Sequence, residues 1–470
     1  MVSICTPHIT NTDTYLNKTT FKHQQWTAIN MKKAPKLILS SIVMAFASHS
    51  FSASSDLISL YKSAENYDAE IFAAKAAFMA EKEGENIALA ELLPSINASA
   101  SAGRTNSNKD SPSSDDSVKS QDYSVSLTQP LVNLQSWHKL SSSEQSTLQA
   151  QSIYLAAQQN LIIDVASAYF NVLRAQENLK SDQSQEAAVK RQYEQAREQF
   201  DVGLIAITDV HEAKASYDSS QTSRIRSEGD VTIATENLSR LTGQYTSELA
   251  TLKSDFPITL DPSSSAEAWA NSAYENNLNI KSAEYELEAL NFQFKSRKSQ
   301  HYPTLNFDAR YGTTKLTNND SGNNNSEEAS ASLNLNIPIY SGGGTQAGVR
   351  KVRYEVEKAK HLLTSAQRQA RVEARTEYIN IKTNIQTTES LQQNIVSRES
   401  ALEATREGYK VGTRNIVEVL DAERNYYTAL RDFANARFDF VESNLRIRRS
   451  AGTLNVKDLE ALNQWLEPIK

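Results

Sequence analysis

Apolar and polar residues alternate in four short segments, two in each half of the chain. The alternation covers 95–104 and 121–130 in the first half, and 304–312 and 329–340 in the second. A two-residue period predicts β-strands. Strands of about ten residues with one apolar and one polar face are typical of outer-membrane barrels. A soluble hairpin with one packed face has the same pattern, so the strands alone leave both alternatives open.

Two very long helices are predicted between and after these strands, over 139–200 and 345–409. The first of these segments contains neither proline nor glycine. With a rise of about 1.5 Å per residue, the two helices would span roughly 93 and 98 Å, far more than the three turns of an average helix. Their apolar residues are small and sparse, which favours helices packed side by side around a wet interior over a Leu-rich coiled coil.

The shorter helices and the loops are predicted from amino-acid composition. Segments rich in Ala, Glu and Lys favour helix, whereas runs of Ser, Asn and Asp favour loops. Shorter helices are predicted over 56–91, 204–245, 264–300 and 413–452, and polar loops over 105–120 and 313–328. The predicted fold class is mixed α/β and mainly α, with a long helical barrel and four strands per chain.

The chain is an internal duplication. Residues 200–210 align with residues 409–419 at an offset of 209. The same offset pairs Pro94 with Pro303, Tyr169 with Tyr378, Asn171 with Asn380, Ala213 with Ala422 and Gly243 with Gly452. So many matches at one offset indicate two copies of one substructure. We therefore expect repeat 1 over 54–262, repeat 2 over 263–453, and two equivalent tail segments, 246–262 and 454–470.

Four strands per chain constrain the assembly if they cross a membrane. Known barrels start at eight strands, and an open sheet in lipid leaves backbone groups at its edges without hydrogen bonds. Several chains would then have to share one barrel. Three chains would give a twelve-stranded barrel, so the prediction is a homotrimer.

The N-terminal residues 1–53 have the features of a targeting segment. A basic stretch over 31–36 precedes a mostly apolar run over 37–47, which is too short to span a bilayer. Small residues follow it. We interpret the segment as a secretory signal peptide that starts at Met31 or farther upstream. The only cysteine, Cys5, lies within it, which excludes an internal disulfide framework.

Composition and charge exclude several classes of protein. Apolar residues make up 39% of the chain, mean hydropathy is −0.53, and no segment after residue 53 has 18 consecutive apolar residues. A large spherical core and a helical membrane protein are therefore not expected. The net charge of −7 argues against nucleic acid as a partner.

One motif has the spacing of a dinucleotide-binding site but lacks the structural context that such a site requires. Residues 342–347, Gly-Gly-Gly-Thr-Gln-Ala, have the spacing of a dinucleotide-binding turn between a strand and a helix. The predicted helix then continues for about 65 residues without returning to a parallel strand, so no βαβ unit forms. The histidines lack ligand spacing, and neither a nucleophile elbow nor a Walker lysine occurs. We expect no catalytic, cofactor or metal residues, and no enzyme.

Two carboxylates are candidates for a functional role if several copies of the chain assemble around a symmetry axis. Glu418 and Asp421 stand three positions apart on one face of a predicted helix. On an isolated helix this is an ordinary solvated face. In a trimer with that face inward, they would form a ring of six carboxylates, which in channels selects cations.

Several long motifs resemble the TolC family of outer-membrane efflux channels. They are FDVGLIAITDV at 200–210, GYKVGTRNIVEVLDA at 408–422, ANAR at 434–437 and AGTLN at 451–455. The resemblance extends over nearly all of 56–465 and includes the duplication. It implies a homotrimer with a twelve-stranded barrel in the outer membrane and a tunnel of twelve helices in the periplasm.

The resemblance also implies functional residues. By matching the family's motifs, Tyr409 and Arg414 would lock the periplasmic end through Thr208 and Asp209. Glu418, where the family has Asp, and Asp421 would form the innermost ring of carboxylates. The helix tips that dock the periplasmic adaptor would be Val202, Gly203 and Leu204 together with Val411, Gly412 and Thr413.

The implied function is that of a passive exit duct for drug efflux and type I protein secretion. Its partners would be a periplasmic adaptor (membrane fusion) protein, an inner-membrane transporter of the RND, ABC or MFS class, and outer-membrane lipid. The alternative class is a trimeric structural or adhesive coiled-coil protein of the cell surface. Such proteins carry their barrel strands in one block at the chain end, whereas here strands lie in the middle of each repeat.

Overall fold

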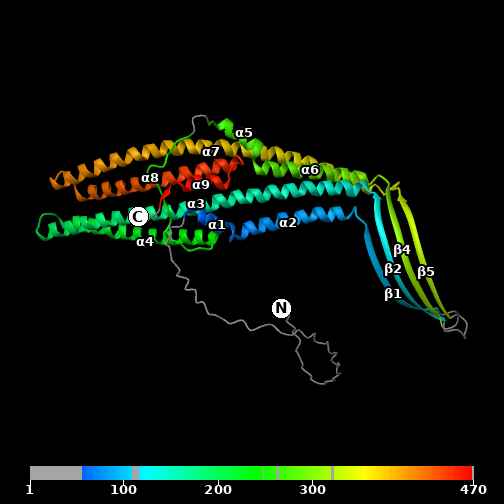
Figure 1. Ribbon diagram of the computed structural model, residues 1–470. Helices are drawn as coiled ribbons and strands as arrows, with labels where there is room; N and C mark the ends of the chain where they lie inside the picture. The colour runs from blue at the N-terminus through cyan, green and yellow to red at the C-terminus, as the bar shows by residue number, and fades with distance from the viewer. Residues whose placement is uncertain (1–55, 108–115, 247, 261–263, 319–321, 468–470) are drawn as a thin grey trace, which may run out of the picture. The chain divides into compact units, whose positions relative to one another are not determined.

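The computed structural model describes residues 56–107, 116–246, 248–260, 264–318 and 322–467 (Figure 1). The predicted signal peptide lies outside these residues. The described chain is mainly helical, which confirms the predicted fold class. Its elements are α1 (Leu57–Glu65), α2 (Ala69–Ala90), β1 (Ser95–Ser107), β2 (Asp116–Val132), α3 (Leu134–Asp201), α4 (Ile207–Thr242), β3 (Thr251–Leu252), α5 (Ala266–Asn276), α6 (Leu278–Ser299), β4 (Thr304–Asn318), β5 (Gly322–Asn336), α7 (Gly344–Lys410), α8 (Ile416–Ser450), α9 (Val456–Asn463) and β6 (Leu466–Glu467).

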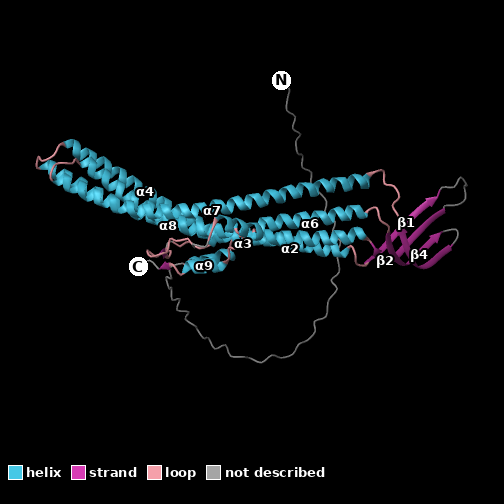
Figure 2. Ribbon diagram, turned by 90° about the horizontal axis from the view of Figure 1, so that it is seen from above, coloured by secondary structure: helices cyan, strands magenta, loops and turns pink. Residues whose placement is uncertain are grey.

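Helices α3 and α7 are the long elements of the two repeats. They contain 68 and 67 residues, and each follows a strand in the chain. Helix α3 contacts α2, α4, α6 and α8, while α7 contacts α5, α6 and α8. Figure 2 shows the helices running alongside one another, with the strands beyond one end of them. Among the described residues, no helix combines the length and apolarity that crossing a bilayer requires.

Two of the predicted helices, 56–91 and 264–300, are each broken into two. The first breaks at Asp68, whose carboxylate accepts hydrogen bonds from the backbone N–H groups of residues 70 and 71 at 2.9 and 3.0 Å. The second breaks at Asn277, whose side-chain oxygen accepts from residues 279 and 280 at 2.9 and 3.3 Å. Both side chains cap the following helix. They occupy equivalent positions in the two repeats, so the break itself is duplicated.

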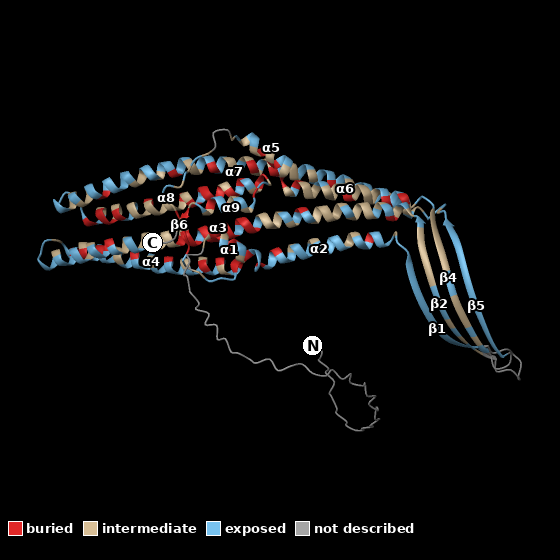
Figure 3. Cartoon of the chain, in the orientation of Figure 1, coloured by how far each residue is buried: buried red, intermediate tan, exposed pale blue. Residues whose placement is uncertain are grey.

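The four long strands form one antiparallel sheet in the order β1-β2-β4-β5. The central pairing, β2 with β4, joins the two repeats and places Val125 opposite Tyr311. Paired residues of an antiparallel ladder share one face. One face therefore carries the exposed apolar side chains Ile96, Tyr123, Val125, Tyr311, Leu333 and Leu335. In the described chain, the helices leave this face uncovered (Figure 3).

The opposite face of the sheet is polar and hydrogen-bonded across the strands. The hydroxyls of Ser99 and Ser124 lie 2.9 Å apart. Asp308 accepts a hydrogen bond from the Thr128 hydroxyl on β2 at 2.7 Å and another from the Asn334 amide on β5 at 2.6 Å. The sheet therefore has one side suited to an apolar environment and one suited to water.

The strands differ from the predicted segments, and the predicted polar loops are wrong in extent. Strand pairing continues to Ser107 opposite Asp116 and to Asn318 opposite Gly322, so residues 105–107, 116–120, 313–318 and 322–328 of the two predicted loops are strand. Polar composition did not reveal this because the hydrogen bonds of a ladder are made by backbone groups, so a strand can continue through Ser, Thr and Asn once the register is fixed. At the other end, β5 stops at Asn336, before Pro338, which cannot donate to a ladder.

A hydrophobic core lies where the tail segments meet α3 and α8. It unites α1, α3, α4, α8 and α9, and its most buried members include Leu57, Tyr169, Phe170, Leu238 and Leu459. The predicted tail segments pair with each other, because β3 and β6 form a two-residue antiparallel ladder. The Tyr169 hydroxyl donates to the carbonyl of Ala250 at 2.5 Å and fixes the first tail segment to α3.

Gly452 ends α8 in a position that only glycine fits. Its φ of 70° lies in the left-handed region, and a Cβ atom there would be 2.2 Å from the carbonyl oxygen of Asn276. Asn276 directly precedes the α5–α6 break. The duplicate position, Gly243, is close to the ring of Tyr67, which precedes the α1–α2 break. The C-terminal ends of α4 and α8 thus each pack against a helix break of the same repeat, the α1–α2 break and the α5–α6 break respectively.

Gly452→Ala should destabilise the fold more than Gly343→Ala. Gly343 also has a left-handed φ, 79°, but a Cβ atom there would have no neighbour within 4 Å. The control should cost only the conformational penalty of about 1–2 kcal/mol, whereas Gly452→Ala must also displace backbone. Thermal unfolding followed by circular dichroism measures the difference. Equal midpoints for the two variants would show that the close approach of Asn276 is unimportant.

Candidate gate and docking tip

The α3–α4 and α7–α8 connections form two matching tips at one end of the helices. In the first, Leu204 N–H donates to Gln199 C=O and Gly203 N–H to Phe200 C=O, both at 2.8 Å. In the second, Thr413 N–H donates to Gly408 C=O at 2.9 Å and Gly412 N–H to Tyr409 C=O at 3.0 Å. This is the Schellman arrangement, with glycine in the left-handed region at φ 77° and 75°.

The tips expose apolar side chains at equivalent places. Val202, Leu204 and Val411 are each more than 70% exposed. A Cβ atom on either Gly203 or Gly412 would have no neighbour within 4 Å. These are the residues expected to dock an adaptor, together with Thr413. Their exposure makes them available for contact with another protein.

Tyr409 lies at the end of α7 and contacts α3. Its hydroxyl donates to Gln199 Oε1 at 3.1 Å. The expected acceptors were Thr208 and Asp209, so the sequence analysis missed this partner. Burial, and then the negative charge of Asp209, raise the pKa of Tyr409. Asp209 is therefore near enough to act on the phenol electrostatically, and the hydroxyl stays protonated as a donor.

Arg414 has a different partner from the one expected. Its guanidinium donates to Glu418, one turn along α8, at 2.5 Å. Glu418 also belongs to a capping box with Asn415, whose side chain accepts from the Glu418 N–H at 2.9 Å. The helix start thus holds Glu418 beside Arg414 on the same chain. In the described part of the single chain, neither Thr208 nor Asp209 accepts a hydrogen bond from Arg414.

Both expected ring carboxylates form ion pairs with arginines of their own neighbourhood. Glu418 pairs with Arg414, and Asp421 pairs with Arg424 on the next turn of α8. The Arg414 guanidinium holds the pKa of Glu418 below its ordinary value. All four side chains are substantially exposed. The neighbouring arginine of each carboxylate partly offsets the negative field that the carboxylate would present.

A small apolar cluster holds the tip end together. It joins Val189 and Ala196 of α3, Ala213 of α4, and Ile416 and Leu420 of α8. Tyr409 packs on its edge. The next buried position of the α8 face, Glu423, is fully buried and accepts a hydrogen bond from Arg406 of α7. The sequence analysis did not single out this residue. The sequence did contain a signal for its burial. Glu423 is the third position of an i, i+4, i+7 series that begins with Ile416 and Leu420, so it lies on the same face of α8 as these apolar residues.

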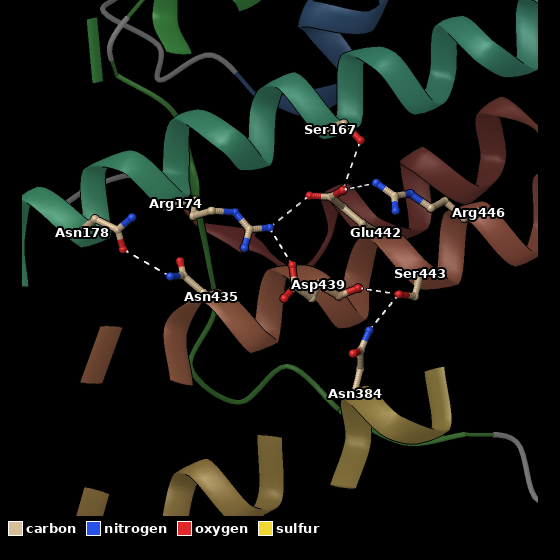
Figure 4. A network of polar contacts seen from close by, with 9 residues as sticks. All are labelled: Ser167, Arg174, Asn178, Asn384, Asn435, Asp439, Glu442, Ser443 and Arg446. Atoms are coloured by element: carbon tan, nitrogen blue, oxygen red, sulfur yellow. Dashed lines mark hydrogen bonds and ion pairs between the residues drawn. The ribbon is translucent and has the colours of Figure 1, made fainter. Parts of the chain in front are cut away.

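Farther from the tip, a polar network joins α3, α7 and α8 (Figure 4). Arg174 of α3 donates to Asp439 at 2.8 Å and to Glu442 at 3.4 Å, both on α8. Glu442, which is largely buried, also accepts from Ser167 and Arg446. Asn178 and Asn435 continue the same interface. Charged and amide groups thus fix α3 against α8 over several turns, where α3 meets the second repeat.

Comparison with known proteins agrees with the duplicated architecture. The family model described as "Outer membrane efflux protein" matches residues 60–244 and 269–453, and the two matches are related by the same offset as the motifs. Outer membrane protein TolC of Vibrio cholerae is 33% identical over 443 residues, which cover 94% of this chain and 100% of that protein. Alkaline protease secretion protein AprF of Pseudomonas aeruginosa is 24% identical, covering 86% of each.

Solved structures have the same fold. The crystal structure of CusC superimposes with a TM-score of 0.75 at 16% identity and covers 84% of this chain and 92% of that one. The arrangement of helices and strands described above is thus one known architecture. By the double match of the family model and the full-length similarity to TolC, this chain belongs to the outer membrane efflux protein family.

Proposed function

We propose that three copies of this chain form a passive exit duct, with the strands as a shared barrel in the outer membrane and the helices as a tunnel in the periplasm. The four-stranded sheet carries the proposal. Among the described residues, its outer strands β1 and β5 each have one edge without a partner strand, and its apolar face is uncovered. Neighbouring copies would pair these edges, and lipid would cover the apolar face.

The periplasmic end would be closed by the tips. Tyr409 ties α7 to α3 within one copy through Gln199. Arg414 is largely exposed and, besides Glu418, would reach Thr208 or Asp209 of an adjacent copy. Hydrogen bonds of this kind favour one arrangement by a modest free energy, so a partner protein can shift the equilibrium toward opening.

The exposed tips would receive a periplasmic adaptor that connects the duct to an energised inner-membrane transporter of the RND, ABC or MFS class. Val202, Gly203 and Leu204 of one tip and Val411, Gly412 and Thr413 of the other would form the docking surface. The duct itself would supply no energy. Its cargo would include drugs and proteins of type I secretion, in line with the efflux family and the secretion relative AprF.

The purified protein should be a trimer in detergent. Open strand edges are costly in an apolar environment, and three copies remove all of them. Light scattering with correction for detergent, and a heat-sensitive shift on a denaturing gel, would measure the assembly. A stable monomer in the outer-membrane fraction would refute both the shared barrel and the tunnel.

Tyr409→Phe combined with Arg414→Ser should increase single-channel conductance several-fold. The lost Tyr409 hydrogen bond contributes roughly 0.5–1.5 kcal/mol in each copy. Three copies, together with the lost arginine contacts, would shift a mostly closed population toward opening. Cells should also become more sensitive to vancomycin. Tyr354→Phe, on an exposed part of α7, is the matched control. Conductance equal to that of the parent would show that these residues do not close the duct.

Cation block should depend on the balance between carboxylates and arginines at the aperture. Glu418→Ala with Asp421→Ala should weaken block by hexaamminecobalt(III) in a planar bilayer, because the ring loses its negative charge. Arg424→Gln should strengthen the block, because it frees Asp421 from its ion pair. Because the pKa of Glu418 is lowered, its charge should persist as pH falls through the ordinary carboxyl range and disappear only below it. Unchanged block in both variants would place the cation site elsewhere.

A further inference from the structure

Glu423 is a charged residue in a position that packing would assign to an apolar one. It follows Ile416 and Leu420 on the buried face of α8, and its side chain has 0% exposure. Val189 and Ala196 of α3 belong to the same cluster as these two residues. A carboxylate in such surroundings loses its water, which costs free energy unless protein groups replace every hydrogen bond.

The replacement is incomplete. Arg406 of α7 donates to Glu423 Oε1 at 2.6 Å, and Gln192 Nε2 of α3 approaches the same oxygen at 3.5 Å. Glu423 Oε2 and Arg406 Nε are both buried and have no hydrogen-bond partner among the described residues. The two atoms belong to one ion pair, so each member keeps one polar group unsatisfied while the tip is packed as seen here.

The α3 helix covers this pair on one side. Gln192 and Gln199 stand two turns apart on α3, and they meet Glu423 and Tyr409 respectively. Arg406 precedes Tyr409 by one turn on α7. The ion pair therefore lies farther from the tip than the Tyr409 contact does. Both lie at the interface of α3 with α7 and α8. If α7 and α8 part from α3, water reaches Oε2 and Nε.

We propose that the Arg406–Glu423 pair lowers the free-energy cost of opening the duct, and so opposes the contacts of Tyr409 and Arg414. This rests on the proposed function, in which the gate opens by separating α7 and α8 from α3. While α3 packs against α7 and α8, Glu423 Oε2 and Arg406 Nε have no hydrogen-bond partner among the described residues. When the helices separate, water can hydrogen-bond to both atoms. An equilibrium between two states responds to any group that is better satisfied in one of them.

Two substitutions should act in opposite directions. Arg406→Met leaves a fully buried carboxylate without its cation, which penalises the closed tip strongly and favours opening. Arg406→Met with Glu423→Leu removes both charges and extends the apolar cluster, which favours closure. Arg406→Lys keeps the charge and should resemble the parent. The matched control is Lys410→Met with Glu407→Leu, which removes an exposed ion pair on the next turn of α7.

Planar-bilayer recordings give the first test. Arg406→Met should raise mean conductance at least twofold over the parent. The double substitution should lower conductance at least twofold when introduced into the Tyr409→Phe/Arg414→Ser background, where closure is weakened. The Lys410/Glu407 control should leave both values close to those of its own background. Heat-induced dissociation of each variant shows whether it is assembled.

Spin-label distances give a second test that needs no current. Cys5 is the only cysteine of the chain, so single cysteines can be placed at exposed Lys190 on α3 and Glu403 on α7 of a mature chain that starts after residue 53. Arg406→Met should lengthen the measured distance or broaden its distribution, and the double substitution should narrow it. If the double substitution instead opens the tip as Arg406→Met does, the pair is a latch and the inference is wrong. A parent that carries no current counts against the proposed function, while the label distances still decide the inference.

Discussion

The antiparallel pairing of β2 with β4 fixes how the two repeats lie together. Val132 opposes Leu305 at one end of this ladder, and α3 starts at Leu134 while α6 ends at Ser299. Helix α3 therefore leaves the sheet beside α6 and packs against it. A one-residue slip in the ladder would turn the apolar face of β4 to the polar side and shift α3 against α6. The register of a few strands thus sets the packing of helices that extend about 100 Å beyond them.

Toward the tips, the hydrogen bonding between repeats changes from a dense network to single bonds beside a small apolar cluster. Around Arg174, charged side chains and several amides join α3 to α8, and a hydrophobic core lies nearby. Closer to the tip, only Ser181 with the Tyr427 carbonyl, Gln192 with Glu423, and Gln199 with Tyr409 are hydrogen-bonded across this interface in the described chain. Local stability follows the number and burial of such contacts. The tip is therefore the part of the interface that can separate at the lowest cost.

Much of this architecture was readable from the sequence because it depends on periodicity. The alternation in 95–104, the uninterrupted helix-forming run of 139–200 and the constant offset between the repeats each reflect a regular backbone pattern. The helix breaks at Asp68 and Asn277 were missed, although Asp and Asn are common caps, because composition averages over single residues. The partners of Arg414 and Tyr409 could not be derived, since the choice between Glu418, Asp209 and Gln199 depends on side-chain distances. Glu423 was missed because its burial arises only when α3 covers α8.

The two repeats share their backbone structure at the tips but differ in the polar side chains at equivalent positions. The two tips share their Schellman hydrogen bonds and left-handed glycines, Gly203 and Gly412. In the alignment of the two repeats, however, Tyr409 corresponds to Phe200 and Arg414 to Ile205, so the donors exist only in the second repeat. The buried Glu423 likewise corresponds to Lys214, which forms an exposed ion pair with Asp218 on its own helix. Under the proposed gating, the first repeat would be the static frame, and the second would carry the groups whose hydrogen bonds and hydration change. A gate that closes by helix packing requires two surfaces of matching shape, of which one moves. Duplication of one fold, followed by divergence of a few polar residues, provides both surfaces.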